Sequence, residues 1–277
     1  MTPFPVEQLL SSGSLAVLFC TVLMALVWLL HLPLKNAAVV DVAWPLGILG
    51  AAMIYLGQGT AALEKRVLLG AMVTLWALRL SLYLLVARVW GKPEEGRYVK
   101  LREEFGTNAA TRFFVFYQLQ AASCVVLALP MFFAAHAPGE GLSTWEKSVA
   151  GLFLLAMCGE WMADRQLSQF KDNAANHGKV CREGLWAWSR HPNYFFEWMI
   201  WMSFALYGFP YPWAILGLVA PALIYYFVNF VTGIPPTEAQ ALRSKGEAYR
   251  AYQQEVSAFF PLPPKAQAAG TEAAREE

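Results

Sequence analysis

Charged residues are scarce in this chain of 277 residues. Asp, Glu, Lys and Arg make up 15% of it and hydrophobic residues 57%, whereas soluble domains have about 25% charged and about 45–50% apolar residues. Mean hydropathy is correspondingly high, at +0.39. The shortage of charge excludes a disordered chain, a fibrous repeat and an ordinary cytosolic enzyme.

Two other features are missing. The formal net charge is only +1, so no overall electrostatic field favours nucleic acid as a partner. The four cysteines, Cys20, Cys124, Cys158 and Cys181, are widely spaced and form no CxxC motif. We therefore expect neither a disulfide framework nor a metal site.

Long runs without charge are present instead. Residues 8–34, 42–63, 113–139 and 198–237 contain no Asp, Glu, Lys or Arg. A helix that crosses a bilayer core needs about 20 apolar residues, so the last run holds two spans separated by a Pro-rich turn. The runs do not alternate as the strands of a barrel would. They predict an all-α integral membrane bundle of seven helices, at about 12–32, 38–57, 67–90, 111–135, 147–165, 194–208 and 213–232.

The distribution of Lys and Arg predicts the orientation. With seven spans, 17 of these residues fall on one side of the membrane, and only Lys65, Arg66 and Lys147 lie on the other. Cytoplasmic loops carry the excess of positive charge, so the N-terminus is outside and the C-terminus in the cytoplasm. We expect one transmembrane domain over 1–265, with a cytoplasmic cavity roofed by the long basic loops, and a disordered tail over 266–277.

The densest motif is Gly-Leu-Trp-Ala-Trp-Ser-Arg-His-Pro-Asn-Tyr-Phe-Phe-Glu-Trp. Pro192 suits the first turn of a helix, which puts Asn193 and Glu197 one turn apart on one face. The free N–H groups at such a helix start, near Arg190 and Lys179, suit a nucleotide phosphate. A basic turn followed by an ordinary span explains the pattern equally well.

A second group consists of Glu160, Asp164 and Lys171, whose offsets of 4 and 11 return to nearly the same helix face. That face would enter the cytoplasmic cavity. The alternative is a charged helix end that contacts lipid headgroups.

The third group consists of two basic clusters. Arg97, Tyr98 and Arg102 precede one predicted span, and Arg243 and Tyr249 follow the last one. Arginine binds phosphate through two parallel hydrogen bonds, and tyrosine bonds a phosphate or stacks on a base. Acidic lipid is the alternative partner of both clusters.

The fourth group lies within the spans. Asp41 and Trp44 share one predicted helix, and Trp76, Arg79 and Tyr83 share the next. An acid in an apolar pocket can stay protonated and donate a hydrogen bond to a substrate carbonyl. A structural ion pair between Asp41 and Arg79 is the alternative.

Taken with the motif above, these residues resemble the steroid 5α-reductase family, most closely its bacterial branch. The resemblance covers most of residues 36–261 and includes Gly-Glu-Ala-Tyr-Arg-Ala-Tyr followed by Phe-Phe-Pro. Isoprenylcysteine carboxyl methyltransferases share a related Arg-His-Pro-x-Tyr. Asn193 and Glu197, together with Asp164, favour the reductases.

The resemblance implies seven membrane helices, NADPH bound by the cytoplasmic loops, and reduction of the Δ4 double bond of a 3-oxo steroid. Asp41 matches a glutamate that bonds the 3-oxo group, and Arg79 and Tyr83 match catalytic residues of the following helix. Trp44 and Trp76 are candidate substrate contacts. The positions that match cofactor contacts are Arg97, Tyr98, Arg102, Asp164, Lys171, Lys179, Asn193, Glu197, Arg243 and Tyr249.

The sequence departs from the eukaryotic enzymes at the substrate end. Val40 replaces a Gln, Trp76 a Tyr and Phe196 a Gly, so the resemblance supports reduction of a lipid enone better than it supports a steroid. The expected substrate enters from the bilayer of a bacterial inner membrane, and the many Lys and Arg favour NADPH over NADH. A membrane methyltransferase that uses S-adenosylmethionine and a non-enzymatic lipid binder or transporter are the alternatives.

Overall fold

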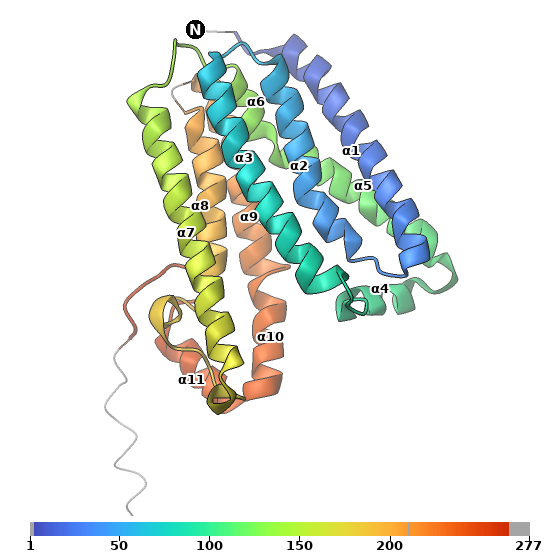
Figure 1. Ribbon diagram of the computed structural model, residues 1–277, viewed down its shortest axis with the longest axis vertical. Coiled ribbons are helices and arrows are strands. Elements are labelled where there is room, and N and C mark those ends of the chain that lie inside the picture. The colour runs from blue at the N-terminus through green and yellow to red at the C-terminus, as the bar shows by residue number, and fades with distance from the viewer. Residues whose placement is uncertain (1–2, 210, 266–277) are drawn as a thin grey trace, which may run out of the picture. The chain divides into compact units, whose positions relative to one another are not determined.

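The computed structural model describes residues 3–209 and 211–265 (Figure 1). Within these ranges the chain forms helices and connecting turns and contains no strand. The prediction of an all-α protein is therefore confirmed. The tail at 266–277, which the sequence predicts to be disordered, lies outside the described residues.

The chain divides into two compact units, which are described separately. Unit 1 comprises Met1–Ala150 and Ser203–Ala220, and unit 2 comprises Gly151–Met202 and Pro221–Glu277. The elements of unit 1 are α1 (Val6–Leu34), α2 (Val39–Gln58), α3 (Leu63–Leu84), a π-helical turn (Leu85–Val89), α4 (Gly96–Phe105), α5 (Ala109–Leu127), α6 (Leu129–Ala135) and a 3-10 helix (Pro212–Leu218).

Helices α1, α2 and α5 pack side by side in unit 1 (Figure 1). Cys20 and Met24 from α1, Tyr55 from α2 and Cys124 from α5 are fully buried in this core. Phe19 of α1 packs against Gly50 of α2, where a Cβ would clash with the Phe19 ring in its present position.

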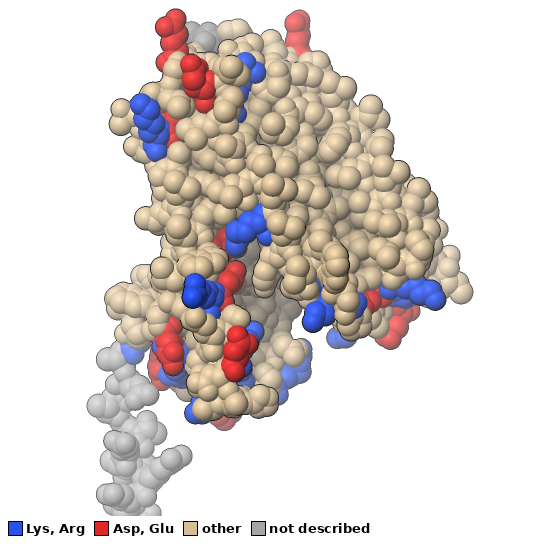
Figure 2. Space-filling model, in the orientation of Figure 1, with Lys and Arg blue, Asp and Glu red and all other residues tan. Residues whose placement is uncertain are grey.

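Five segments of the described residues are long and apolar enough to cross a membrane, so this is a multi-pass membrane protein. Much of their apolar surface remains outside the core, and the face over α1 and α2 shows no charged side chain between its two ends (Figure 2). The five segments are Val6–Leu34, Val39–Gln58, Leu63–Val89, Gly96–Ala135 and Pro212–Lys245.

The other two predicted spans correspond to α7 (Thr144–Asp172) and α8 (Pro192–Tyr207). Helix α7 is 29 residues long but contains Glu160 and Asp164, and α8 has only 16 residues. Both are helical, as expected, but composition and length do not single them out as spans.

Prolines cause the main differences from the predicted boundaries. The span predicted at 111–135 is divided at Ala128, because Pro130 has no N–H and its ring clashes with the preceding turn. The last predicted span starts as a 3-10 helix at Pro212, and its α-helix begins only at Val219.

Unit 2 adds three helices to its parts of α7 and α8. These are α9 (Val219–Phe230), α10 (Ile234–Lys245) and α11 (Glu247–Glu255). The sequence analysis did not predict α10 and α11 as helices, nor α4 in unit 1. Tyr249, Tyr252 and Val256 form a small core with side chains of α10. Tertiary packing of short amphipathic segments therefore stabilises this part of the chain.

A buried ion pair connects α3 to the first turn of α7 within unit 1. Lys65 Nζ lies 3.0 Å from Glu146 Oε1, and the two side chains are 7% and 3% exposed. Lys65 also donates to the Pro138 carbonyl at 3.0 Å, and the Ser143 amide donates to Glu146 at 3.0 Å. Both charges are thus paired and hydrogen-bonded, which burial of an ion pair requires.

Candidate functional site

Asp41 binds two arginines and a tyrosine in unit 1. Its Oδ2 accepts from Arg88 Nη1 at 2.9 Å and from Arg97 Nη2, and its Oδ1 accepts from the Tyr98 hydroxyl at 2.6 Å. Glu95 pairs with the same arginines at 3.3 and 3.4 Å. We call these five residues the Asp41 cluster. Its two carboxylates balance its two guanidinium groups.

The backbone around the cluster explains how these side chains meet. Asp41 lies in the first turn of α2, and Arg88 lies in the π-helical turn that continues α3. Such turns widen a helix by one residue and occur often at functional sites. Arg97 and Tyr98 belong to the first turn of α4, where the guanidinium lies 4.7 Å from the centre of the Tyr98 ring. Sequence analysis put Asp41 among catalytic residues and Arg97 and Tyr98 among cofactor contacts; the structure brings all three together.

A second ion pair supports this arrangement. Arg102 donates to both oxygens of Glu94, at 3.0 and 2.7 Å, and the Ala37 amide donates to Glu94 at 2.7 Å. Burial opposes the charge of Glu94, but these hydrogen bonds outweigh it and lower the pKa of the carboxyl. Glu94 therefore joins the loop before α4 to the start of α2, and Arg102, predicted to contact a cofactor, pairs with this carboxylate from within α4.

The remaining unit 1 predictions lie on α2 and α3. Trp44 donates to the Ser123 hydroxyl at 2.9 Å, and its ring centre is 6.4 Å from that of the fully buried Trp76. Arg79 is half-buried on α3, one turn before the exposed Tyr83. The arginines that bind Asp41 in the structure are Arg88 and Arg97. The sequence analysis named Arg79 as its alternative partner.

In unit 2, α7 and α8 bring three predicted cofactor residues to one region. Asn193 Nδ2 donates to Asp164 Oδ1 at 3.1 Å, and Glu197, one turn further along α8, accepts from Trp201 at 3.0 Å. Asn193 Oδ1 is buried and has no hydrogen-bond partner among the described residues. An unpaired buried acceptor is costly, so this oxygen is suited to a ligand that donates a hydrogen bond.

The turn before α8 is held by Glu238 of α10. Its Oε1 accepts from Arg190 Nε at 2.7 Å and lies 3.2 Å from His191 Nε2. The Tyr249 hydroxyl donates to the same oxygen at 3.4 Å, and Gln253 donates to Oε2 at 2.6 Å. We call these five residues the Glu238 cluster. Arg190 is thus paired with a carboxylate inside the protein. It is therefore not available as a cation for the phosphate site that the sequence predicts beside it.

Tyr249 has a structural place in this cluster. It is buried, and burial together with the nearby Glu238 carboxylate raises the pKa of its phenol above the ordinary value. Its hydroxyl therefore stays protonated and donates to Glu238. By contrast Lys171, Lys179 and Arg243 are exposed, and Arg243 donates to Gln240 at 2.9 Å.

Comparison with known proteins identifies the family. A family model described as "Protein of unknown function (DUF1295)" matches residues 27–256. The chain belongs to the DUF1295 family. It is also similar to an uncharacterized protein of Schizosaccharomyces pombe, with 28% identity over 255 aligned residues that cover 82% of this chain and 73% of that protein. No solved structure gives a significant match.

The DUF1295 match includes every candidate site residue described above. It also includes Arg88, Glu94, Glu95 and Glu238, which sequence analysis did not select. Arg88 was counted only as positive-inside charge at the end of a span. Glu238 follows Pro235 and Pro236, which suit the start of a helix, and this was the available signal for a structured segment there.

Proposed function

We propose that this DUF1295 protein is an NADPH-dependent membrane reductase that reduces the C=C bond of a lipid enone, such as a 3-oxo-Δ4-steroid. The observation that carries the proposal is Asn193 Oδ1, a buried acceptor without a partner among the described residues. It lies beside Asp164 on the first turn of α8, where the resemblance to the 5α-reductases puts cofactor contacts.

The residues present fit a nicotinamide nucleotide. Asn193 Oδ1 suits the NH2 group of a carboxamide, since that group needs an acceptor. Asp164 fixes the orientation of the Asn193 amide through its hydrogen bond. The exposed Lys171, Lys179 and Arg243 are suited to phosphate, because they lie at the surface with their charges accessible. Bound NADPH would supply a hydride.

The Asp41 cluster is proposed to bind the carbonyl of the enone. Negative charge develops on that oxygen during reduction and must be stabilised. In the structure both Asp41 oxygens accept hydrogen bonds, so Asp41 holds donors in place. The side chains of Arg88 and Arg97, 36% and 46% exposed, supply N–H donors for that oxygen. Tyr83 and Arg79 complete the proposed catalytic set, and Trp44 and Trp76 the substrate contacts.

We further propose the topology that the charge bias supports. Helices α7 and α8 complete seven spans, the basic loops and the C-terminus face the cytoplasm, and the membrane is a bacterial inner membrane. Seventeen Lys and Arg on one side against three on the other support this orientation.

The test is a comparison of ligands on the purified protein. Binding of NADPH, NADH and S-adenosylmethionine is measured, with mass spectrometry of any nucleotide that co-purifies. We expect NADPH to bind most tightly and Asn193→Ala to weaken it, while Lys147→Ala, an exposed cation on the other predicted side, leaves it unchanged. If the protein binds S-adenosylmethionine but not NADPH, the proposal of a reductase is wrong and a methyltransferase takes its place. Binding of none would favour a lipid binder or transporter.

A further inference from the structure

Unit 1 has an apolar groove between α1 and α2, with a volume of about 620 Å³. This volume is within the roughly 300–1,000 Å³ range of ligand sites. Leu18, Val22 and Leu26 line it from α1 and Met53 from α2, and each is about half exposed. The groove lies on two of the candidate membrane-spanning segments. Its surface chemistry suits a hydrocarbon chain.

One end of this α1/α2 groove is polar. There it is lined by Gly57 and Gln58, the last two residues of α2. Arg66 of α3 does not line the groove but lies near this end, because its Nη1 donates to the carbonyl of Leu56, the residue before Gly57, at 2.8 Å. Its Nε donates to the Ala61 carbonyl at 2.9 Å. The guanidinium group is therefore fixed one residue from the groove lining.

Arg66 keeps its charge available. Both of its hydrogen bonds are to backbone carbonyls, and no carboxylate of the described residues pairs with it. Two bonds use only part of the five N–H donors of a guanidinium group. Lys65, its neighbour, differs because Glu146 neutralises it. An apolar groove that ends beside an uncompensated cation is complementary to an apolar chain that ends in an anion.

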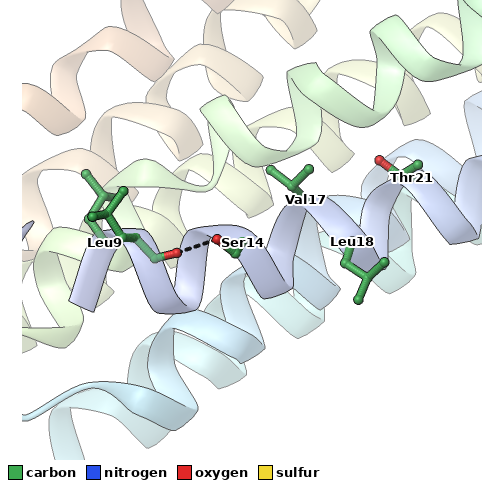
Figure 3. A pocket seen from close by; sticks show the side chains of 6 residues that line it. Leu9, Ser14, Val17, Leu18 and Thr21 are labelled. Atoms are coloured by element: carbon green, nitrogen blue, oxygen red, sulfur yellow. Dashed lines mark hydrogen bonds between the residues drawn. The ribbon is translucent and has the colours of Figure 1, made fainter. Parts of the chain in front are cut away.

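We propose that the α1/α2 groove binds an anionic membrane phospholipid, with an acyl chain along α1 and α2 and the phosphate paired with Arg66. A second groove provides the contrast. It has a volume of about 460 Å³ and is lined by α1 alone (Figure 3), and none of the described residues that line it is positively charged. Its Ser14 hydroxyl donates to the Leu10 carbonyl at 2.6 Å. This second groove offers an acyl chain no anchor for a headgroup.

Gly57 provides a direct way to fill the proposed site. A Cβ added there meets nothing within 4 Å, so a side chain can start at this position, and we expect that of Gly57→Leu to occupy the polar end of the groove. Gly13 on α1 is the matched control, because its Cβ position is equally open and it does not line the groove.

The experiment measures lipid bound to the detergent-purified full chain by native mass spectrometry. Phosphatidylglycerol and phosphatidylcholine with identical acyl chains are offered at equal concentration. We expect a preference of about fivefold for phosphatidylglycerol, the size expected for one cation near an anionic headgroup. Arg66→Gln should abolish the preference and Arg66→Lys should keep it. Lys147→Gln, the control for loss of an exposed charge, should not change it.

Gly57→Leu should reduce the binding of both lipids, whereas Gly13→Leu should not. Thermal unfolding of each variant shows that the fold is intact. An equal affinity of the wild type for the two lipids overturns the proposal. The proposal is also overturned if Arg66→Gln keeps the preference for phosphatidylglycerol or if Arg66→Lys loses it. Equal amounts of bound lipid in Gly57→Leu and Gly13→Leu overturn it as well.

Discussion

Removal of the Glu238 carboxylate should destabilise unit 2 strongly. Arg190, His191 and Glu238 have side chains that are only 11%, 4% and 13% exposed. Loss of one partner of a buried ion pair typically costs about 3–5 kcal/mol, because the other charge stays buried without compensation. Arg190 also donates to the carbonyls of Gln253 and Val256. These two hydrogen bonds remain in Glu238→Ala. We therefore expect this change to lower the free energy of unfolding by about 3 kcal/mol, the lower end of that range.

Glu238→Gln should cost less. The amide oxygen can still accept from Arg190 and Tyr249, and Gln253 can turn its own amide so that its oxygen faces the new NH2 group. Only the negative charge is then lost, which should lower the free energy of unfolding by about 1–2 kcal/mol. The order of stability should be wild type, then Glu238→Gln, then Glu238→Ala.

Thermal unfolding in one detergent, followed by tryptophan fluorescence, measures this order. For a chain of this size about 3 kcal/mol corresponds to a fall in Tm on the order of 10 °C. The control is Glu247→Ala, which removes a surface carboxylate that is 83% exposed and pairs with Arg250. It should shift Tm by less than about 2 °C. If Glu238→Ala and the control unfold at the same temperature, the assigned role of the Glu238 cluster is wrong.

Three further predictions concern unit 1. Asp41→Leu should lower enone reduction by about 10²–10³-fold with NADPH binding intact, and wild-type turnover in this variant would remove Asp41 from the site. Lys65→Met should destabilise the protein more than the double change Lys65→Met, Glu146→Leu, because the single change leaves a buried charge; chemical unfolding that ranks them the other way refutes this. Glu94 has a lowered pKa through its bonds to Arg102, so its contribution to stability is present above the ordinary glutamate value of 4.5 and is lost as the pH falls through the lowered value. Tm measured against pH should therefore fall less steeply on acidification in Glu94→Gln, and equal slopes would contradict the pairing.

Hydrophobic runs in the sequence were sufficient to predict the helices of the membrane region. Their length and lack of charge predicted α2 to within one residue at each end and α1 and α3 to within six, because in a bilayer each backbone polar group must be bonded within its own helix. The break between α5 and α6 was also encoded locally, by Pro130, but a count of apolar residues does not register it. The regular spacing of Asn193 and Glu197 likewise followed from helix geometry alone.

Side-chain partners depended on the tertiary structure. The sequence left Arg79 as an alternative partner of Asp41, whereas the structure pairs Asp41 with Arg88 and Arg97, which are 47 and 56 residues away. Similarly, Arg190 meets Glu238 only because α10 packs against the turn before α8. A hydrogen bond requires its atoms to come within about 3 Å, and helical periodicity extends only along one helix. Contacts between separate helices are therefore decided by packing, which the local sequence does not encode.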